Sequence, residues 1–123
     1  MKVLCVERDF FALRQMKREV PKIVPEAIVH YCRDPNKAAA LAEAEGCDIL
    51  LTGIDMGTAE DEGVTLAEKV SRLNPRVNII FVTVCEPREY ANRIIPLRLS
   101  GYVRKPYEPS QLVDEFANLR YAI

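Results

Sequence analysis

Asp48-Ile49-Leu50-Leu51-Thr52-Gly53-Ile54-Asp55-Met56-Gly57 begins as an apolar run of strand length and ends as a glycine-punctuated loop. Such a run suits a central strand of a parallel sheet, because these strands are covered on both faces. In open α/β sheets, ligands and chemistry gather at the carboxyl ends of the strands. Gly53 stands at that end here and has no side chain with which to do chemistry.

The segments on both sides of this run repeat one order, a strand followed by a helix. Strands are expected at Lys2–Val6, Ala27–Cys32, Cys47–Thr52, Val77–Thr83 and Gly101–Arg104. Helix starts or stops are expected at Asp9, at Pro21 and Pro25, at Asp34-Pro35, at Gly46, at Asn74-Pro75, at Glu86-Pro87 and at Pro109. Five βα units with short connections predict a parallel sheet with right-handed crossovers and helices on both faces.

The inward faces of the helices follow from apolar spacing close to the helical repeat. We expect Leu13, Met16, Val20 and Ile23 in the first helix, Ala38, Leu41 and Ala42 in the second, Leu66, Ala67, Val70 and Leu73 in the third, Ala91, Ile94 and Ile95 in the fourth, and Leu112, Val113, Phe116 and Leu119 in the last. The fourth helix is expected to bend or end near Pro96.

Length and composition fit one domain spanning residues 1–123. The chain is 49% hydrophobic, with a formal net charge of -1. This charge balance argues against direct nucleic-acid binding, and no apolar stretch approaches membrane-spanning length. We therefore expect a cytoplasmic protein without membrane contact. The four cysteines lack metal-ligand spacing and are expected to be buried, reduced thiols.

Four ordered motifs carry a family resemblance over the whole chain: Val6-Glu7-Arg8-Asp9, Asp48 to Met56, Phe81-Val82-Thr83, and Ser100-Gly101-Tyr102-Val103-Arg104-Lys105-Pro106. Together they resemble the CheY-like receiver domain of two-component response regulators. Asn78 to Thr83 and Glu89-Tyr90-Ala91 look closest to regulators with a LytTR-type DNA-binding domain. The resemblance implies a flavodoxin-like, doubly wound (βα)5 fold with strand order 2-1-3-4-5, and a cis peptide between Lys105 and Pro106.

The residues that carry phosphorylation in the family are partly missing. By resemblance, the phosphoacceptor position is Gly53 and a Mg²⁺-ligating acid position is Arg8, whereas Glu7, Thr83 and Lys105 keep family-like residues. The formal charge of Glu7, Arg8, Gly53 and Lys105 is +1, where the family pattern gives -2. An acyl phosphate needs a carboxylate nucleophile, and Mg²⁺ needs carboxylate oxygens. We expect a degenerate pseudo-receiver with no catalytic residues, no cofactor, and lost or weak Mg²⁺ binding.

The two cations of this degenerate site, Arg8 and Lys105, need other partners than a phosphoacceptor and a metal ion. Arg8 either pairs with Glu7 or Asp55 in place of the metal, or swings out to solvent. Lys105, without an aspartate partner, is expected to pair with Glu7. Asp55 is the nearest carboxylate to position 53, but it lies in the loop and is disfavoured as a substitute acceptor. Asp9 completes the acidic segment after the first strand.

The remaining switch positions also have two interpretations. Tyr102 is either a switch aromatic without a phosphoryl signal or a half-buried strand residue. Pro106 shapes its loop whatever the chemistry. Tyr90 and Tyr107 are expected to be exposed and to suit an interface. The surface of the fourth helix, fifth strand and fifth helix is the candidate site for a protein partner or a homodimer.

Three functions are consistent with these patterns. The first is a non-enzymatic signalling domain of a phosphorelay regulator that acts through protein contacts, with a histidine kinase among its candidate partners. The second is a conventional phosphorylated receiver that regulates transcription through a separate DNA-binding domain. The third is a flavodoxin-like enzyme or small-molecule binder, which the sequence disfavours because no Gly-rich phosphate loop follows the first strand.

Overall fold

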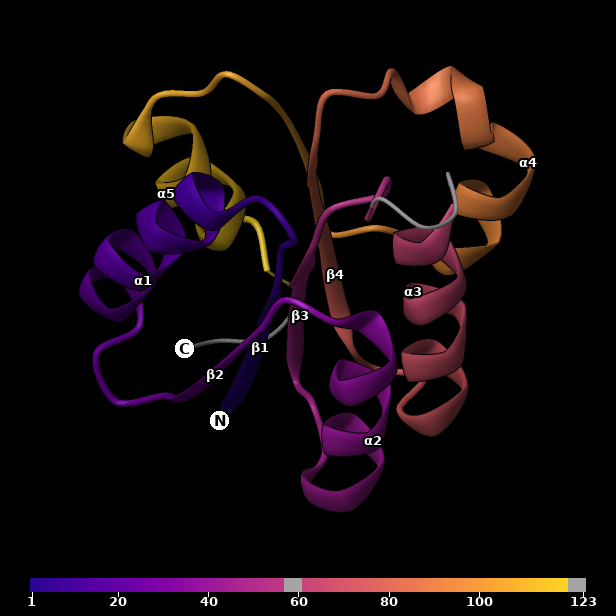
Figure 1. Ribbon diagram of the computed structural model, residues 1–123, viewed down its shortest axis with the longest axis horizontal. Helices are drawn as coiled ribbons and strands as arrows, with labels where there is room; N and C mark the ends of the chain where they lie inside the picture. The colour runs from indigo at the N-terminus through magenta and orange to yellow at the C-terminus, as the bar shows by residue number, and fades with distance from the viewer. Residues whose placement is uncertain (57–60, 120–123) are drawn as a thin grey trace.

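The computed structural model describes residues 1–56 and 61–119, and Gly57 of the opening stretch lies outside them. Five parallel strands form one sheet in the order β2-β1-β3-β4-β5, which confirms the predicted topology (Figure 1). The strands are β1 Lys2–Val6, β2 Ile28–Cys32, β3 Ile49–Thr52, β4 Asn78–Thr83 and β5 Gly101–Arg104. The helices are α1 Phe10–Ile23, α2 Pro35–Glu45, α3 Glu62–Leu73, α4 Ala91–Ile94 and α5 Pro109–Ala117.

The helices divide between the two faces of the sheet, with α1 and α5 on one side and α2, α3 and α4 on the other (Figure 1). Each face has its own apolar cluster. All four residues of β3 are buried, because β3 lies between β1 and β4 with helices on both sides. The continuous apolar run Ile49–Thr52 is therefore explained by its central place.

The strand register brings the carboxyl ends of the central strands to one edge. Val6 is level with Thr52, and Thr52 is level with Phe81. The loops that follow β1, β3 and β4 therefore begin beside one another. The chain after β5 joins them, since the Lys105 amide donates to the Thr83 carbonyl at 2.9 Å.

The predicted helix caps are confirmed at α1 and α2. Asp9 and Asp34 each accept a hydrogen bond from the amide two residues later, at 2.9 and 2.8 Å. Gly46 ends α2 with a φ of 83°, a conformation that glycine adopts without a side-chain clash. Pro21 was expected to help end α1, but it lies inside the helix, which continues to Ile23.

The fourth helix departs most from expectation. The α4 segment (87–97) consists of a 3₁₀ helix at Pro87–Tyr90, the single α-turn of α4, and a second 3₁₀ helix at Ile95–Leu97. Pro96 explains the break after α4, because its nitrogen cannot donate a helical hydrogen bond. Ile94 is buried as predicted, but Ile95 is 72% exposed and its predicted inward position is wrong.

Two more predicted core positions are wrong, since Leu73 and Val113 are each 46% exposed. Leu73 is the last residue of α3, and Val113 directly follows the buried Leu112 in α5. The other predicted inward positions of these two helices are buried at Leu66, Ala67, Val70, Leu112 and Phe116, whereas Leu119 lies beyond the end of α5 and is only partly buried. Within the described parts of the chain, no helix is both long and apolar enough to span a bilayer.

Candidate functional site

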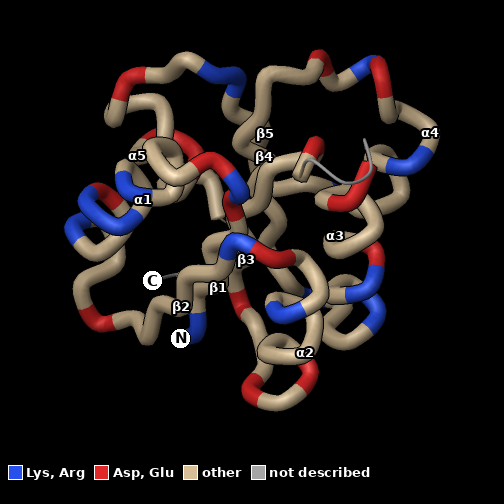
Figure 2. The backbone as a smooth tube through the Cα atoms, viewed as in Figure 1, with Lys and Arg blue, Asp and Glu red and all other residues tan. Residues whose placement is uncertain are grey.

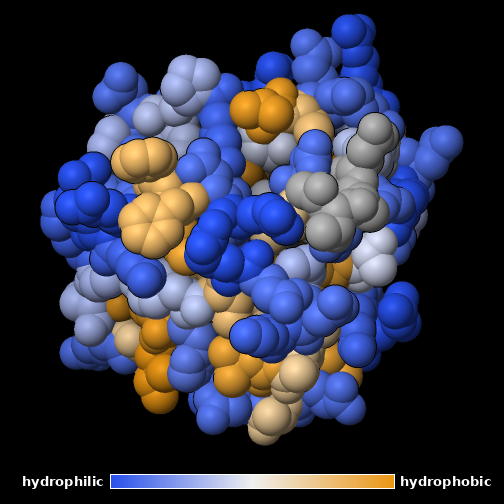
Figure 3. Space-filling model, viewed as in Figure 1, coloured by the Kyte–Doolittle hydropathy of each residue, from blue (hydrophilic) through white to orange (hydrophobic). Residues whose placement is uncertain are grey.

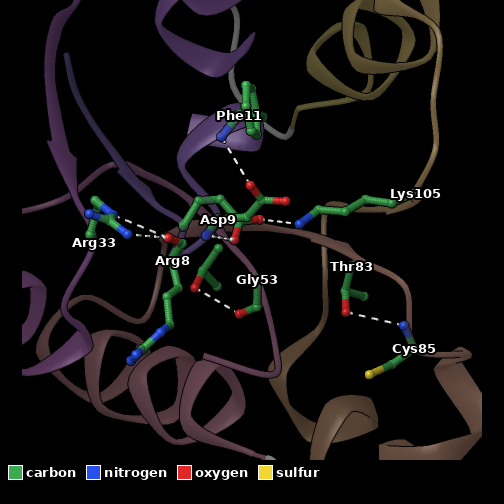
Figure 4. A network of polar contacts seen from close by, with 10 residues as sticks. Arg8, Asp9, Phe11, Arg33, Gly53, Thr83, Cys85 and Lys105 are labelled. Carbon is green, nitrogen blue, oxygen red and sulfur yellow. Dashed lines mark hydrogen bonds and ion pairs between the residues drawn. The ribbon is translucent and has the colours of Figure 1, made fainter. Parts of the chain in front are cut away.

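Glu7 and Lys105 form an ion pair at the carboxyl edge of the sheet (Figure 4). Glu7 directly follows β1 and is only 2% exposed, whereas Lys105 directly follows β5 and reaches across to the Glu7 Oε1 atom. The second Glu7 oxygen accepts a hydrogen bond from the Asp9 amide at 3.0 Å. Both oxygens of this buried carboxylate are thus satisfied, as burial of a charge requires. The predicted pairing of Lys105 with Glu7 is confirmed.

Gly53 directly follows β3 and faces this ion pair. A Cβ atom at Gly53 would lie 3.5 and 3.7 Å from the two Glu7 carboxylate oxygens and 3.3 Å from the Met56 sulfur. The direction in which a side chain would leave the backbone is therefore aimed at Glu7. We call Glu7, Gly53, Thr83 and Lys105 the strand-end site.

A second glycine fixes the backbone behind Gly53. The Gly63 amide, in the first turn of α3, donates to the Ile54 carbonyl at 2.8 Å. A Cβ atom on Gly63 would lie 1.7 Å from the Gly53 carbonyl oxygen, so only glycine permits this approach. The strand-end site therefore depends on a glycine that sequence analysis did not single out.

Arg8 is exposed at the surface and also bonds to the backbone of the loop after β3. Its Nη1 atom donates to the Met56 carbonyl oxygen at 3.1 Å, and Figure 4 shows the side chain extending away from Lys105. Among the described residues Glu7 is paired with Lys105, and no ion pair joins it to Arg8. Arg8 instead ties the loop after β1 to the loop after β3.

The two other carboxylates named from the sequence lie apart from the ion pair. Asp9 uses its side chain to cap α1, by accepting from the Phe11 amide. Asp55 is exposed, beyond the end of β3. Both are exposed, whereas Glu7 is buried.

Thr83 and Tyr102 both bond to the backbone of Cys85, in the loop after β4. The Thr83 hydroxyl accepts from the Cys85 amide at 3.2 Å, and the Tyr102 hydroxyl donates to the Cys85 carbonyl at 2.7 Å. Tyr102 is half-buried and packs edge-on against Phe81, with ring centroids 6.1 Å apart. Burial raises the pKa of Tyr102 to about 12. The two side chains together hold the loop that leads into the α4 segment.

An arginine that sequence analysis missed ties the α4 segment to α3. Arg93 donates to both carboxylate oxygens of Glu68, at 2.6 and 3.2 Å, to Asp61 at 2.5 Å and to the Thr65 hydroxyl at 3.0 Å. The hydrogen bonds raise the pKa of Arg93 and lower that of Glu68. No spacing in the sequence signals this contact, because the two sides are about 30 residues apart.

The interface residues named from the sequence are less exposed than expected. Tyr90 and Tyr107 are both half-buried and pack against the two apolar clusters, so their predicted exposure is wrong. Burial raises the pKa of Tyr107 to about 12, and its hydroxyl has no hydrogen-bond partner among the described residues. The peptide between Lys105 and Pro106 is cis, as the resemblance implied.

The cysteines are free thiols with no redox arrangement in the part of the chain that the structure describes. Cys5 and Cys47 are buried, and burial raises the pKa of the Cys5 thiol and raises that of Cys47 to about 12. Cys32 and Cys85 are only partly buried, so their predicted full burial is wrong.

The family model of the response regulator receiver domain matches residues 3–117. The chain belongs to the receiver domain family. It is therefore a receiver of the two-component signalling class, and receivers as a class contact kinases and other proteins. No curated protein matches the sequence.

Solved receiver structures share this fold at low sequence identity. The response regulatory domain of mrkE from Klebsiella pneumoniae is 25% identical, with a TM-score of 0.82 and coverage of 97% of this chain and 94% of that one. The receiver domain of AraT, a response regulator from Geobacillus stearothermophilus, is 26% identical, with a TM-score of 0.77 and coverage of 96% and 91%. A CheY-like receiver from Methanospirillum hungatei is 23% identical, with a TM-score of 0.80 and coverage of 94% and 90%.

Proposed function

We propose that this receiver signals through protein contacts without forming an aspartyl phosphate. The observation that carries the proposal is the position of Gly53. The side-chain direction there points at the Glu7 carboxylate, which is paired with Lys105, and position 53 itself supplies no carboxylate where a receiver's acceptor would stand. An acyl phosphate needs a carboxylate nucleophile at that place.

Glu7 does not supply the missing nucleophile. Its two oxygens are engaged by the Lys105 ammonium and the Asp9 amide, and it is buried beneath the loops. Esterification of a Glu7 oxygen to phosphate would remove the free carboxylate that Lys105 contacts. Breaking an ion pair that holds the buried Glu7 carboxylate is costly, which supports a structural role for Glu7.

The residues of the strand-end site do not fit Mg²⁺, the ion that receivers use. Mg²⁺ requires near-octahedral oxygen ligands, with one or two carboxylates free to bind it. Here the Lys105 ammonium already lies against Glu7, and Arg8 replaces the neighbouring acid. Among the described residues, no three His, Cys, Asp or Glu side chains are grouped to hold a metal ion. We therefore derive no step through a metal.

The α4–β5–α5 surface is the proposed contact for a protein partner or a second copy of this chain. Its exposed residues include Ile95 and Val113, and Arg104 contacts Glu86 at 3.7 Å. Arg93 fixes the α4 segment against α3, which supports a surface that is formed before any signal arrives. A histidine kinase remains a proposed partner, and a LytTR-type output domain a proposed neighbour in the regulator.

Phosphodonor chemistry tests the proposal directly. The protein is incubated with acetyl phosphate and Mg²⁺ and its intact mass is measured. We expect no base-labile phosphoryl adduct on the natural sequence. The double variant Arg8→Asp with Gly53→Asp is the positive control, because it restores both missing carboxylates and is expected to gain one adduct.

The single variant Arg8→Asp is the matched negative control, since it repairs the metal ligand but not the acceptor. A stable adduct on the natural sequence would overturn the proposal and favour the conventional phosphorylated receiver. Titration with beryllofluoride and Mg²⁺, followed by NMR, gives an independent readout. Saturable shifts near Thr83 and Lys105 in the natural sequence contradict the proposal.

A further inference from the structure

Two exposed phenylalanines stand at the start of α1, next to the edge strand β2. Phe10 is 60% exposed and Phe11 is 77% exposed, and their rings meet edge to face at 6.4 Å. Phenylalanine at this exposure loses the free energy of burial, so a pair of such rings commonly marks a contact. Figure 3 shows light-orange side chains over α1 with blue ones beside them.

Cations surround these rings in a defined arrangement. The Arg33 guanidinium lies over the Phe10 ring, 5.7 Å from its centroid, and donates twice to the Arg8 carbonyl at 3.1 Å. The Lys17 ammonium lies over the Tyr31 ring of β2 at 5.6 Å. Cation–π contacts and backbone hydrogen bonds restrict long side chains before any partner arrives. We call Phe10, Phe11, Arg14, Lys17, Tyr31 and Arg33 the α1–β2 surface.

The α1–β2 surface is hollowed as well as charged. A depression of about 230 Å³ is lined by Phe10, Leu13, Arg14 and Lys17. Its floor is apolar and its rim is cationic. Such a shape suits one apolar side chain of a partner, with carboxylates beside it.

The α1–β2 surface carries three cations in a chain whose formal net charge is -1. These three cations contribute +3 to the formal net charge. Because the whole chain has a net charge of -1, all its other residues together carry -4. Figure 2 shows basic positions recurring along α1. Nearby acids are already engaged, since Asp9 and Asp34 cap helices and Glu19 contacts Arg18 and Lys22.

We propose that the α1–β2 surface binds an acidic, amphipathic segment of a protein partner. The apolar side chain of that segment fills the depression against Phe10 and Phe11, and its carboxylates meet Arg14, Lys17 and Arg33. This site is separate from the α4–β5–α5 surface, and it stands whether or not the receiver takes a phosphoryl group.

A protein segment fits these observations better than other polyanions. A nucleic acid or a lipid bilayer extends beyond the three cations and meets the net negative remainder of the domain. A lipid surface also requires more cationic and apolar contact than this small surface offers. A short peptide confines its negative charge to the α1–β2 surface.

NMR titration of the ¹⁵N-labelled protein tests the proposal. The probe is a short helical peptide of Glu and Leu with the leucines on one face. We expect saturable shifts confined to α1, Tyr31 and Arg33, with an affinity that falls as salt rises. Phe11→Ala and Arg14→Glu are each expected to weaken binding about tenfold.

Matched controls separate this surface from general effects of charge and hydrophobicity. Arg76→Glu changes the net charge as Arg14→Glu does, and Val113→Ala trims an exposed apolar residue elsewhere, so both are expected to bind as the natural sequence does. The same peptide with Lys in place of Glu is expected not to bind.

Four results overturn the proposal: no binding of the acidic peptide, equal binding of the lysine peptide, equal loss in Arg76→Glu, or shifts centred on another surface. Tighter binding to phosphatidylglycerol vesicles or to single-stranded DNA than to the acidic peptide also overturns it. Failure of the phosphodonor test leaves all of these outcomes unchanged, so the two proposals fail separately.

Discussion

Replacing Gly53 with aspartate restores the carboxylate that this receiver lacks. The structure allows the resulting loss in the free energy of unfolding to be estimated. The new side chain leaves the backbone 3.5 Å from a Glu7 oxygen. Two like charges about 4 Å apart repel by about 4 kcal/mol at an effective dielectric constant of about 20. Attraction to Lys105, which contacts Glu7, is of similar size and opposite sign. The penalty for burying the new carboxylate remains, so Gly53→Asp should lower the free energy of unfolding by about 2–4 kcal/mol at pH 7.

The pH dependence follows from the same charges. The charges of Glu7 and Lys105 offset each other, and burial disfavours the charged form of the new aspartate, so its pKa in the folded state lies above its unfolded value of about 3.9. The loss of unfolding free energy that the charged aspartate causes is therefore present above the folded-state pKa. It disappears as the pH falls below the unfolded value, where the group is protonated in both states. Gly53→Asn has nearly the same shape without the charge, and should cost about half as much or less at pH 7.

Urea denaturation followed by circular dichroism measures these differences. The gap between the Asp and Asn variants should narrow from pH 7 to about pH 4. In the double variant with Arg8→Asp, Mg²⁺ should raise the free energy of unfolding, because only the folded state assembles the ligands. Equal stability of the Asp and Asn variants at pH 7, with no effect of pH, would refute the inferred closeness of position 53 to Glu7.

Three further measurements probe other parts of the fold. Gly63→Ala should cost about 2–4 kcal/mol in urea denaturation, because its Cβ would lie 1.7 Å from the Gly53 carbonyl oxygen. Gly53→Ala should change stability by only about 1 kcal/mol, because its closest contact, 3.3 Å to the Met56 sulfur, is with a flexible side chain; equal losses contradict this packing. Arg93→Gln should cost about 1 kcal/mol and speed hydrogen exchange in the α4 segment, and unchanged exchange there would show that the ion pairs do not hold it. Tyr102 and Tyr107 should titrate near pH 12 by ultraviolet absorbance; since the fold favours their neutral forms, the stability they contribute is complete below about pH 10 and is lost as the pH rises through 12.

The sheet was predictable because a central strand is buried on both faces and therefore has a continuous apolar sequence. Ile49–Thr52 and Asn78–Thr83 are apolar along almost their whole length, and their place between other strands requires that. Caps such as Asp9 and Asp34 were predictable for a local reason, since a cap bonds to an amide two residues away.

The strand-end site was predictable only in part. Lys105 and Glu7 are 98 residues apart, and their pairing followed from strand topology and charge rather than from any local pattern. The bond from Arg8 to the Met56 carbonyl oxygen was not predictable, because a guanidinium can donate to any backbone oxygen within its reach. The break in the fourth helix was visible at Pro96, but the contact of Arg93 with α3 depends on a tertiary arrangement that periodicity does not encode.

A receiver without an acceptor needs another source of bias if it is to switch. A ligand shifts a conformational equilibrium only by its difference in affinity between two states, and a phosphoryl group supplies no such difference where it cannot attach. On the proposed function, any shift in the α4 segment must come from a bound partner. Hydrogen exchange in the α4 segment, measured with and without the acidic peptide at the α1–β2 surface, tests this coupling. Because coupling is reciprocal, slower exchange with peptide requires that Arg93→Gln, which loosens the α4 segment, also weaken peptide binding. If the peptide slows exchange there while Arg93→Gln leaves its affinity unchanged, Arg93 takes no part in any link between the two surfaces.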